Sequence, residues 1–181
     1  MKELRLVPFL DDELGKAIDL RVEIDWSVDA SELIIQFVVT GEIDRLKIPP
    51  ISETPQRRVG LWETTCFELF LGSTGQENYW EINLSSSGDW NVFRLDRYRE
   101  NLREEPVIEI LPSQVEQQGD RMTIDVTLDI QKLGLCRDTI ELSATSVLEE
   151  TTGNISHWAV VHAGTTADFH LRKSFVISGL G

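Results

Sequence analysis

Two segments of the chain alternate strictly between apolar and polar residues. Residues 18–26, with the sequence IDLRVEIDW, have an apolar side chain at every second position, and residues 122–130, MTIDVTLDI, repeat this pattern. A β-strand directs successive side chains to opposite faces of a sheet, so a period of two indicates one face in the core and one in solvent. The pattern predicts two half-exposed strands.

Further segments have the composition of strands without such strict alternation. Residues 33–40, LIIQFVVT, are apolar and β-branched nearly throughout, which predicts a strand inside a sheet and covered on both faces. A turn at Thr152-Gly153-Asn154 predicts a hairpin between its flanking segments. The remaining expected strands are those of this hairpin, at 140–146 and 156–161, and two short ones at 4–7 and 107–111.

The run 61–99 contains three more strand-like segments and three of the five tryptophans. If its apolar residues share one core, the first hairpin pairs Leu71 with Trp80, Leu69 with Ile82 and Phe67 with Leu84, because a slip of one residue would turn one set outward. In the same register Glu68 lies opposite Asn83, and Phe70 lies opposite Glu81.

The same rule applied to the second hairpin pairs Ile82 with Phe93 and Trp80 with Leu95, so that Glu81 faces Arg94. An alternative alignment instead puts Trp90 and Val92 in the core with Ile82. In the first register the outer face carries a carboxylate, an amide, a guanidinium and an indole. Such groups suit a pyranose, whose C–H faces stack on aromatic rings and whose hydroxyls need donors and acceptors. Trp62 or Trp90 is the candidate platform, and the alternative is an ordinary solvated ion pair on an exposed sheet.

About ten strands with no helical pattern longer than one turn predict an all-β protein, specifically a two-sheet antiparallel β-sandwich. Pro49, Pro50 and Pro55 predict an irregular surface connection over 48–60, and 131–134 predicts one helical turn closed by Gly134. No repeat or composition shift divides the chain, so we expect residues 1–181 to form a single domain.

The formal net charge of -14 disfavours nucleic acid and anionic membranes as partners, because both attract Lys and Arg. No apolar run approaches the roughly 20 residues that span a bilayer, and charges interrupt the N-terminal segment before a signal peptide could form. We therefore expect a cytoplasmic protein. Cys66 and Cys136 match no disulfide or zinc pattern, and both are expected to be reduced, buried thiols.

Three segments resemble the DOMON-like superfamily, specifically small bacterial DOMON-like proteins related to family 9 carbohydrate-binding modules. Residues 62–71, WETTCFELFL, resemble the tryptophan, acidic pair and Glu-Ile/Leu-Phe signature of those modules. Residues 79–88, YWEINLSSSG, are similar to the strand and turn that follow it, and residues 157–175 resemble the C-terminal segment of the bacterial subgroup. The chain departs from the sugar-binding pattern at Thr64-Thr65, where relatives have acidic residues, and at Ser86, where proline is common.

The resemblance implies a jelly-roll sandwich that holds sugar between aromatic rings, with acidic, amide and arginine side chains around it. By motif position it implicates one tryptophan and four polar residues, with a second ring still to be chosen from two tryptophans. These candidate ligand-binding residues are Trp62, Glu68, Glu81, Asn83, Arg94 and either Trp90 or Trp158.

Other chemistries have weaker support. Haem-binding DOMON relatives use a methionine and a histidine, but Met122 lies in an alternating strand and is expected in the core. His157, His162 and His170 have spacings that fit no common zinc motif and are expected to be structural. The acidic runs 11–13 and 104–105 lack the ligand spacing of a calcium loop, although sugar-binding relatives carry structural calcium.

Glu68 and Glu81 could form a carboxylate pair of the kind that hydrolyses glycosides, but no other motif supports an enzyme. The sequence thus predicts a non-catalytic domain that binds a small polar ligand, most plainly a saccharide, without a metal or cofactor. The alternative from a different class is a protein interaction module, or a homodimer, that docks through its exposed sheet. A concave pocket with a tryptophan at its rim would favour the ligand, whereas a flat apolar patch would favour a protein partner.

Overall fold

The structure is a computed structural model that describes residues 1–27 and 31–178. It confirms the all-β prediction, because these residues form eleven strands and only short helical turns. The strands are β1 (Lys2–Pro8), β2 (Ile18–Trp26), β3 (Glu32–Gly41), β4 (Cys66–Ser73), β5 (Tyr79–Ser85), β6 (Trp90–Leu95), β7 (Arg103–Glu104), β8 (Ser113–Gln118), β9 (Arg121–Asp129), β10 (Ile140–Glu149) and β11 (Ile155–Ala159). The helical turns are α1 (Glu13–Ala17), η1 (Ile43–Arg45), η2 (Leu61–Glu63), η3 (Gln131–Leu133) and η4 (Arg172–Ser174).

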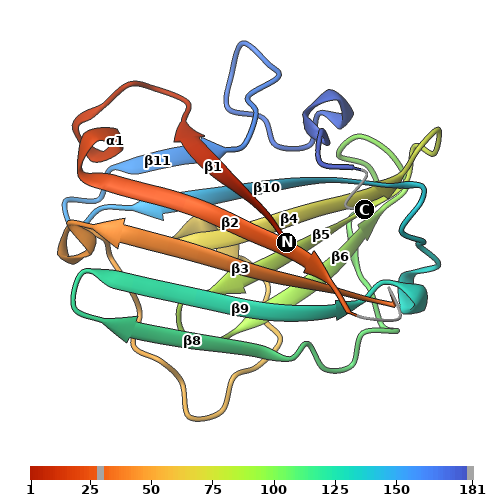
Figure 1. Ribbon diagram of the computed structural model, residues 1–181, viewed down its shortest axis with the longest axis horizontal. Helices are drawn as coiled ribbons and strands as arrows, with labels where there is room; N and C mark the ends of the chain where they lie inside the picture. The colour runs from red at the N-terminus through yellow and green to blue at the C-terminus, as the bar shows by residue number, and fades with distance from the viewer. Residues whose placement is uncertain (28–30, 179–181) are drawn as a thin grey trace.

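All strand pairs are antiparallel and run in the order β7-β6-β5-β4-β10-β11-β1-β2-β3-β9-β8. The sheet curls into two layers at β1, where Lys2–Leu6 pair with β2 and Val7 and Pro8 pair with β11. Figure 1 shows β2, β3, β9 and β8 in front of β4, β5, β6 and β10. The main core lies between the layers, which is the sandwich that the sequence predicts.

The two alternating segments form the expected half-exposed strands, β2 and β9, with Leu20, Val22 and Ile24 buried from β2. The prediction for β3 was wrong in one respect. This strand lies inside the sheet between β2 and β9, but Ile34 on its outer face is 42% exposed. Composition alone indicated two covered faces, whereas near Ile34 only the inner face is covered.

The predicted strand at 107–111 is absent. Pro106 and Pro112 bracket the segment and cannot donate backbone hydrogen bonds to a ladder. The segment runs instead as an irregular connection that buries Ile108 and Leu111. The guanidinium of Arg57 donates to the carbonyl oxygen of Ile108, so a side chain replaces one of the missing ladder partners.

Three other local predictions are confirmed. Segment 131–134 forms the turn η3, and Gly134 closes it in the left-handed region with φ 71°. Strands β10 and β11 pair as a hairpin around the turn that contains Gly153. The connection 48–60 has no helix or named strand, and its one isolated bridge joins Arg57 to Trp90.

The two cysteines lie in different environments. Cys66 is buried, as expected, and burial raises the pKa of its thiol well above the usual range. Cys136 is exposed, which corrects the expectation, and its sulfur lies 3.1 Å from Oγ1 of Thr139. Among the helices of the described residues, none has the length and apolar character that crossing a bilayer requires.

The first central hairpin has the predicted register, with Leu71 opposite Trp80, Glu68 opposite Asn83 and Phe70 opposite Glu81. In the second hairpin the first alignment was wrong by one residue. Glu81 pairs with Phe93, and Arg94 pairs with Trp80.

The alternative alignment is the one observed, with Val92 opposite Ile82 and Trp90 opposite Leu84 in the core. The reason is that both faces of β6 are covered. Trp90 and Val92 are buried between the layers, while Phe93 and Leu95 are buried on the outer side. A strand that is apolar on both faces gives no preference between registers that differ by one residue.

Candidate functional site

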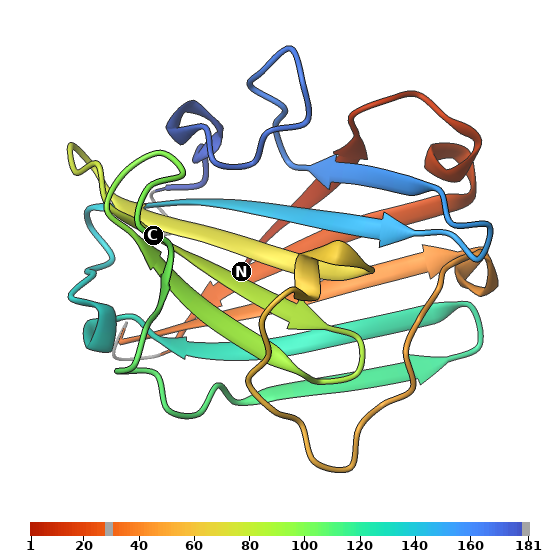
Figure 2. The same ribbon diagram turned by 180° about the vertical axis from the view of Figure 1, so that it is seen from behind.

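A pocket lies on the outer face of β4 and β5, on the side away from the main core. Two segments that are distant in sequence cover this face: the β6–β7 loop around Arg99 and the C-terminal segment around Phe169 (Figure 2). They pack on a second apolar cluster, termed here the outer cluster. Its members are Phe70, Tyr79, Leu95, Val147, Ala159, Phe169 and Phe175.

The pocket has a volume of about 340 Å³ and has both apolar and polar walls. The size is in the range of small-molecule sites. Aromatic rings and aliphatic side chains form one part of the lining, and two carboxyls, two imidazoles and a guanidinium form the other. The lining residues are Trp62, Glu68, Phe70, Glu81, Leu95, Arg99, Leu102, Val147, His157, Ala167, Phe169 and His170.

Trp62 is held at the pocket by a tight turn. Gly60 precedes η2 with φ 82°, a conformation that favours glycine, and the turn lays Trp62 over the outer face of β6. Its ring contacts Phe93 edge to face, with 5.6 Å between the ring centroids. Trp62 remains partly exposed, so one indole surface is available to a ligand.

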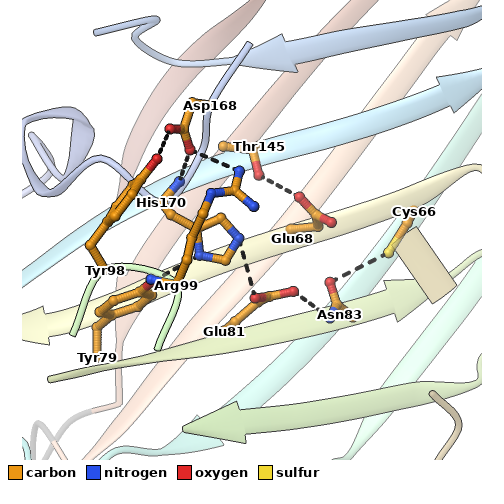
Figure 3. Close-up of polar contacts among 10 residues, drawn as sticks. All are labelled: Cys66, Glu68, Tyr79, Glu81, Asn83, Tyr98, Arg99, Thr145, Asp168 and His170. Atoms are coloured by element: carbon orange, nitrogen blue, oxygen red, sulfur yellow. Dashed lines mark hydrogen bonds and ion pairs between the residues drawn. The ribbon is translucent and has the colours of Figure 1, made fainter. Parts of the chain in front are cut away.

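Glu68 is 3% exposed on β4, and its carboxyl group lines the pocket. The Thr145 hydroxyl on β10 donates to Oε2 of Glu68 at 3.0 Å (Figure 3). Burial, with the nearby charge of Glu81 adding to it, raises the pKa of Glu68 from 4.5 to about 8. Glu68 is therefore mainly a neutral carboxylic acid at pH 7.

Glu81 on β5 is 5% exposed and is held from behind by an amide. Asn83 donates from Nδ2 to Oε1 of Glu81 at 2.9 Å, and the Cys66 sulfur lies 3.7 Å from Oδ1 of Asn83. Burial raises the pKa of Glu81, while the hydrogen bond from Asn83 and the charge of Arg99 oppose the increase. The two carboxyls thus lie on adjacent strands with only neutral hydrogen-bond donors attached to them.

Tyr79 and His170 form a short chain that leads to Glu81. The backbone N–H of Arg99 donates to the Tyr79 hydroxyl oxygen at 3.2 Å, and this hydroxyl lies 2.8 Å from Nδ1 of His170. We assign the Tyr79 proton to this second bond, which places the imidazole proton on Nε2. Nε2 lies 3.8 Å from Oε2 of Glu81. Burial, with the charge of Arg99 adding to it, lowers the pKa of His170 to about 4, so the ring is neutral at pH 7.

Asp168 joins the two covering segments across the top of the pocket. Its carboxylate accepts from the Tyr98 hydroxyl at 2.6 Å, from the Arg99 guanidinium at 3.0 Å and from the backbone N–H of His170 at 3.1 Å (Figure 3). Partial burial alone would raise its pKa, but these hydrogen bonds outweigh that effect and lower it. The direct ionic partner of Arg99 is therefore Asp168, and its charge acts on Glu81 without a hydrogen bond between them.

We expect Asp168→Ala to separate the two covering segments locally without unfolding the sandwich. The variant loses three hydrogen bonds to a partly exposed carboxylate, which corresponds to about 1–3 kcal/mol of stability. Hydrogen exchange at the β6–β7 loop and around His170 should accelerate, while β2 and β9 remain protected. Unchanged exchange in both covering segments would contradict this role of Asp168.

The predicted site residues divide into two groups. Trp62, Glu68 and Glu81 line the pocket, and Asn83 lies directly behind Glu81. Trp90, Arg94 and Trp158 do not line it, and each placement is a correction to the sequence-based site.

Trp90 is 6% exposed and belongs to the core between the layers, where Arg57 lies over its ring. Trp158 is 1% exposed in the same core. The corrected register explains the position of Arg94. Because Arg94 pairs with Trp80, its side chain lies on the inner side of the sheet, and its guanidinium is 5.5 Å from the Trp80 ring centroid.

Sequence reasoning missed Arg99, Asp168 and Phe169 and assigned His157 and His170 structural roles. Histidine spacing gave no signal, since these two rings reach the pocket from β11 and from the C-terminal segment. His162, in contrast, contacts the carbonyl oxygen of Val7 at 2.8 Å. The only sequence signal was that Asp168 and its neighbours fall in the third segment of the family resemblance.

The other proposed centres also have definite positions. Met122 is fully buried in the main core. Asp12 of the acidic run 11–13 caps α1 by accepting from the backbone N–H of Gly15, and Glu105 accepts from the Trp80 indole at 3.0 Å. Within residues 1–27 and 31–178, no group of three His, Cys, Asp or Glu side chains is placed to hold a metal ion.

Comparisons with known proteins find similarity in structure only. No protein-family model matches the chain, and no curated protein sequence matches it. A solved structure from Bacteroides uniformis, described provisionally as a carbohydrate-binding protein, matches with TM-score 0.66 and 11% identity over 96% of this chain and 84% of its own.

A family 9 carbohydrate-binding module from Caldicellulosiruptor kristjanssonii matches in two complexes. The complex with glucose has TM-score 0.51 and 10% identity, covering 88% of this chain and 73% of the module. The complex with cellotriose has TM-score 0.56 and 10% identity, covering 97% and 80%. At such identities the likeness establishes a shared β-sandwich fold.

Proposed function

We propose that this protein is a non-catalytic domain that binds a saccharide in the pocket between β4, β5 and the two covering segments. The observation that supports this most directly is the combination of an aromatic lining with converging hydrogen-bonding groups in a volume of about 340 Å³. The structural neighbours support it further, because one of them is a module that was solved with glucose and with cellotriose.

The chemistry of the lining suits a pyranose ring. Trp62, Phe70 and Phe169 offer apolar surfaces to its C–H faces. Neutral Glu68 can both donate and accept a hydrogen bond, and Nε2–H of His170 is a donor, so sugar hydroxyls find both kinds of partner. The hollow shape with a partly exposed tryptophan supports a ligand over a protein docked on a flat sheet.

Trp62→Ala is expected to reduce saccharide affinity about tenfold or more, because the variant loses one stacking surface while the sandwich retains its core. Isothermal titration calorimetry against a panel that includes glucose, cellotriose and other mono- and disaccharides measures the effect. Trp26→Ala is the matched control, since Trp26 is also partly exposed but lies at the end of β2, outside the pocket lining.

The control should bind as the wild type does once both are shown to be folded by thermal unfolding. Absence of heat for every sugar with the folded wild type would contradict the proposed function. Equal loss in both tryptophan variants would place the ligand outside this pocket.

A further inference from the structure

We propose that the pocket prefers a saccharide carrying a protonated amine, such as a 2-amino-2-deoxyhexose, and that the ammonium group binds at the carboxyls of Glu68 and Glu81. This inference rests on the proposed function and makes its ligand class specific. Its basis is that, in the part of the chain that the structure describes, the two carboxyls in the pocket lining have no cationic partner in contact and one of their oxygens has no hydrogen-bond partner.

The first observation is that neither carboxyl has a cationic partner in contact within hydrogen-bond distance. Thr145 and Asn83, which donate to Glu68 and Glu81, are both neutral. The Arg99 guanidinium is bonded to Asp168 at 3.0 Å. Both carboxyls are at least nine-tenths buried, and a carboxylate ionised at such a depth ordinarily requires a cationic partner, which the contacting side chains do not supply.

The second observation is a Glu68 oxygen that has no hydrogen-bond partner among the described residues. Within residues 1–27 and 31–178 its Oε2 accepts from Thr145, whereas its Oε1 takes part in no hydrogen bond. Glu68 is 97% buried and lines the pocket, so the remaining oxygen is offered to an occupant of the cavity. An ammonium group has three N–H donors and could bond this oxygen and Oε2 of Glu81 together.

The third observation is that the other titratable groups around the carboxyls do not supply positive charge at neutral pH. Burial lowers the pKa of His170 to about 4, and burial with the charge of His162 lowers that of His157. Tyr79 and Cys66 have raised pKa values because they are buried, and both stay neutral. A ligand that brings its own cation would complete the site.

Binding of the cation is coupled to loss of one proton. Before binding, Glu68 holds a proton, consistent with its pKa of about 8. On binding, that proton passes to the buffer and the carboxylate pairs with the ammonium, which keeps its own protons. Between pH 5.5 and 6.5 the affinity for the amine should rise about tenfold, since one proton is released per ligand bound. The affinity for an uncharged sugar should stay nearly constant over the same range.

Calorimetry with D-glucosamine, D-glucose and N-acetyl-D-glucosamine tests the proposal at pH 6.5, where glucosamine is protonated. We expect glucosamine to bind at least tenfold more tightly than the two neutral sugars, because charge-assisted hydrogen bonds to a buried carboxylate are the stronger kind. Repeating the titration in two buffers of different ionisation enthalpy should show release of nearly one proton for glucosamine and none for glucose.

Glu68→Gln preserves the side-chain shape and the acceptor for Thr145 but cannot become charged. This variant should therefore bind glucosamine and the two neutral sugars with about equal affinity. Glu109→Gln is the matched control, because it makes the same substitution at an exposed loop position and should leave the preference intact. If Glu68→Gln does not fold, the proton count on the wild type still tests the proposal.

The two proposals fail in distinguishable ways. Binding of glucose with equal or higher affinity than glucosamine, without proton release, would overturn the amine preference and leave saccharide binding standing. Absence of binding for all three sugars and for the wider panel would overturn both.

Discussion

Replacing Glu68 with glutamine is expected to stabilise the protein strongly at alkaline pH and only slightly at acidic pH. Folding raises the pKa of this buried carboxyl from 4.5 to about 8, so the folded state binds its proton more tightly than the unfolded state does. As the pH rises above 4.5, the unfolded chain loses the proton first, and the contribution of Glu68 to the stability of the wild type falls until about pH 8.

Glutamine has no charge to lose and removes this dependence. The gain of the variant over the wild type should therefore grow by roughly 4 kcal/mol between pH 5 and pH 8.5, as the difference in pKa implies. Urea unfolding at the two pH values measures it, with Glu109→Gln as the control for a change of net charge. A gain in stability of the same size at both pH values would show that folding does not raise the pKa of Glu68.

The second large effect concerns Trp158, one of the two tryptophans that the sequence offered as the second ring of the site. Trp158→Ala is expected to lower the free energy of unfolding by about 3–5 kcal/mol, because the indole is 1% exposed in the main core and its removal leaves a cavity. Trp62→Ala, which removes a partly exposed ring at the pocket, should have the smaller effect on stability.

Trp158→Phe is a milder test of the same position. The Trp158 indole N–H has no hydrogen-bond partner in the part of the chain described, so phenylalanine loses volume but no polar contact. We expect a loss of about 1–2 kcal/mol in urea unfolding and unchanged ligand affinity per folded molecule. If folded Trp158→Phe bound the ligand more weakly at unchanged stability, Trp158 would be part of the binding site.

The pocket is built from segments that only folding brings together. Glu68 and Glu81 come from adjacent strands, Arg99 comes from the loop after β6, and His170 comes from the C-terminal segment. The strands fix the carboxyls, while Asp168 fastens the covering segments to each other. Saccharide affinity, the preference for an amino sugar and hydrogen exchange in the covering segments can each be measured separately.

Strand alternation was sufficient wherever one face of a strand meets solvent. It identified β2 and β9, and in the first central hairpin it paired Leu69 with Ile82 and so placed Glu68 and Glu81 on the outer face. A slip by one residue there would move core residues outward, and the hydrophobic pattern excludes it. The fold class and the two carboxyls of the pocket lining were therefore predictable.

Alternation was insufficient where both faces of a strand are buried. The outer face of β6 is covered by η2 and the loop that follows the strand, so Trp90 and Phe93 are both buried on opposite sides. The pattern then could not choose the register, and Arg94 was assigned to the wrong face. Trp158 was a candidate ring for a different reason, because the family resemblance left the second ring to be chosen between Trp90 and Trp158.

The sequence by itself determined an all-β sandwich and the side of the sheet on which Glu68, Glu81 and Asn83 lie, because a period of two links each residue to a face. Only the tertiary structure decided that this side is hollowed into a pocket, that Trp62 lines it, and that Arg99, Asp168 and His170 complete it. The physical reason is that burial of the carboxyls and the contacts among these residues depend on segments some 70 positions apart, and local periodicity carries no information on such contacts.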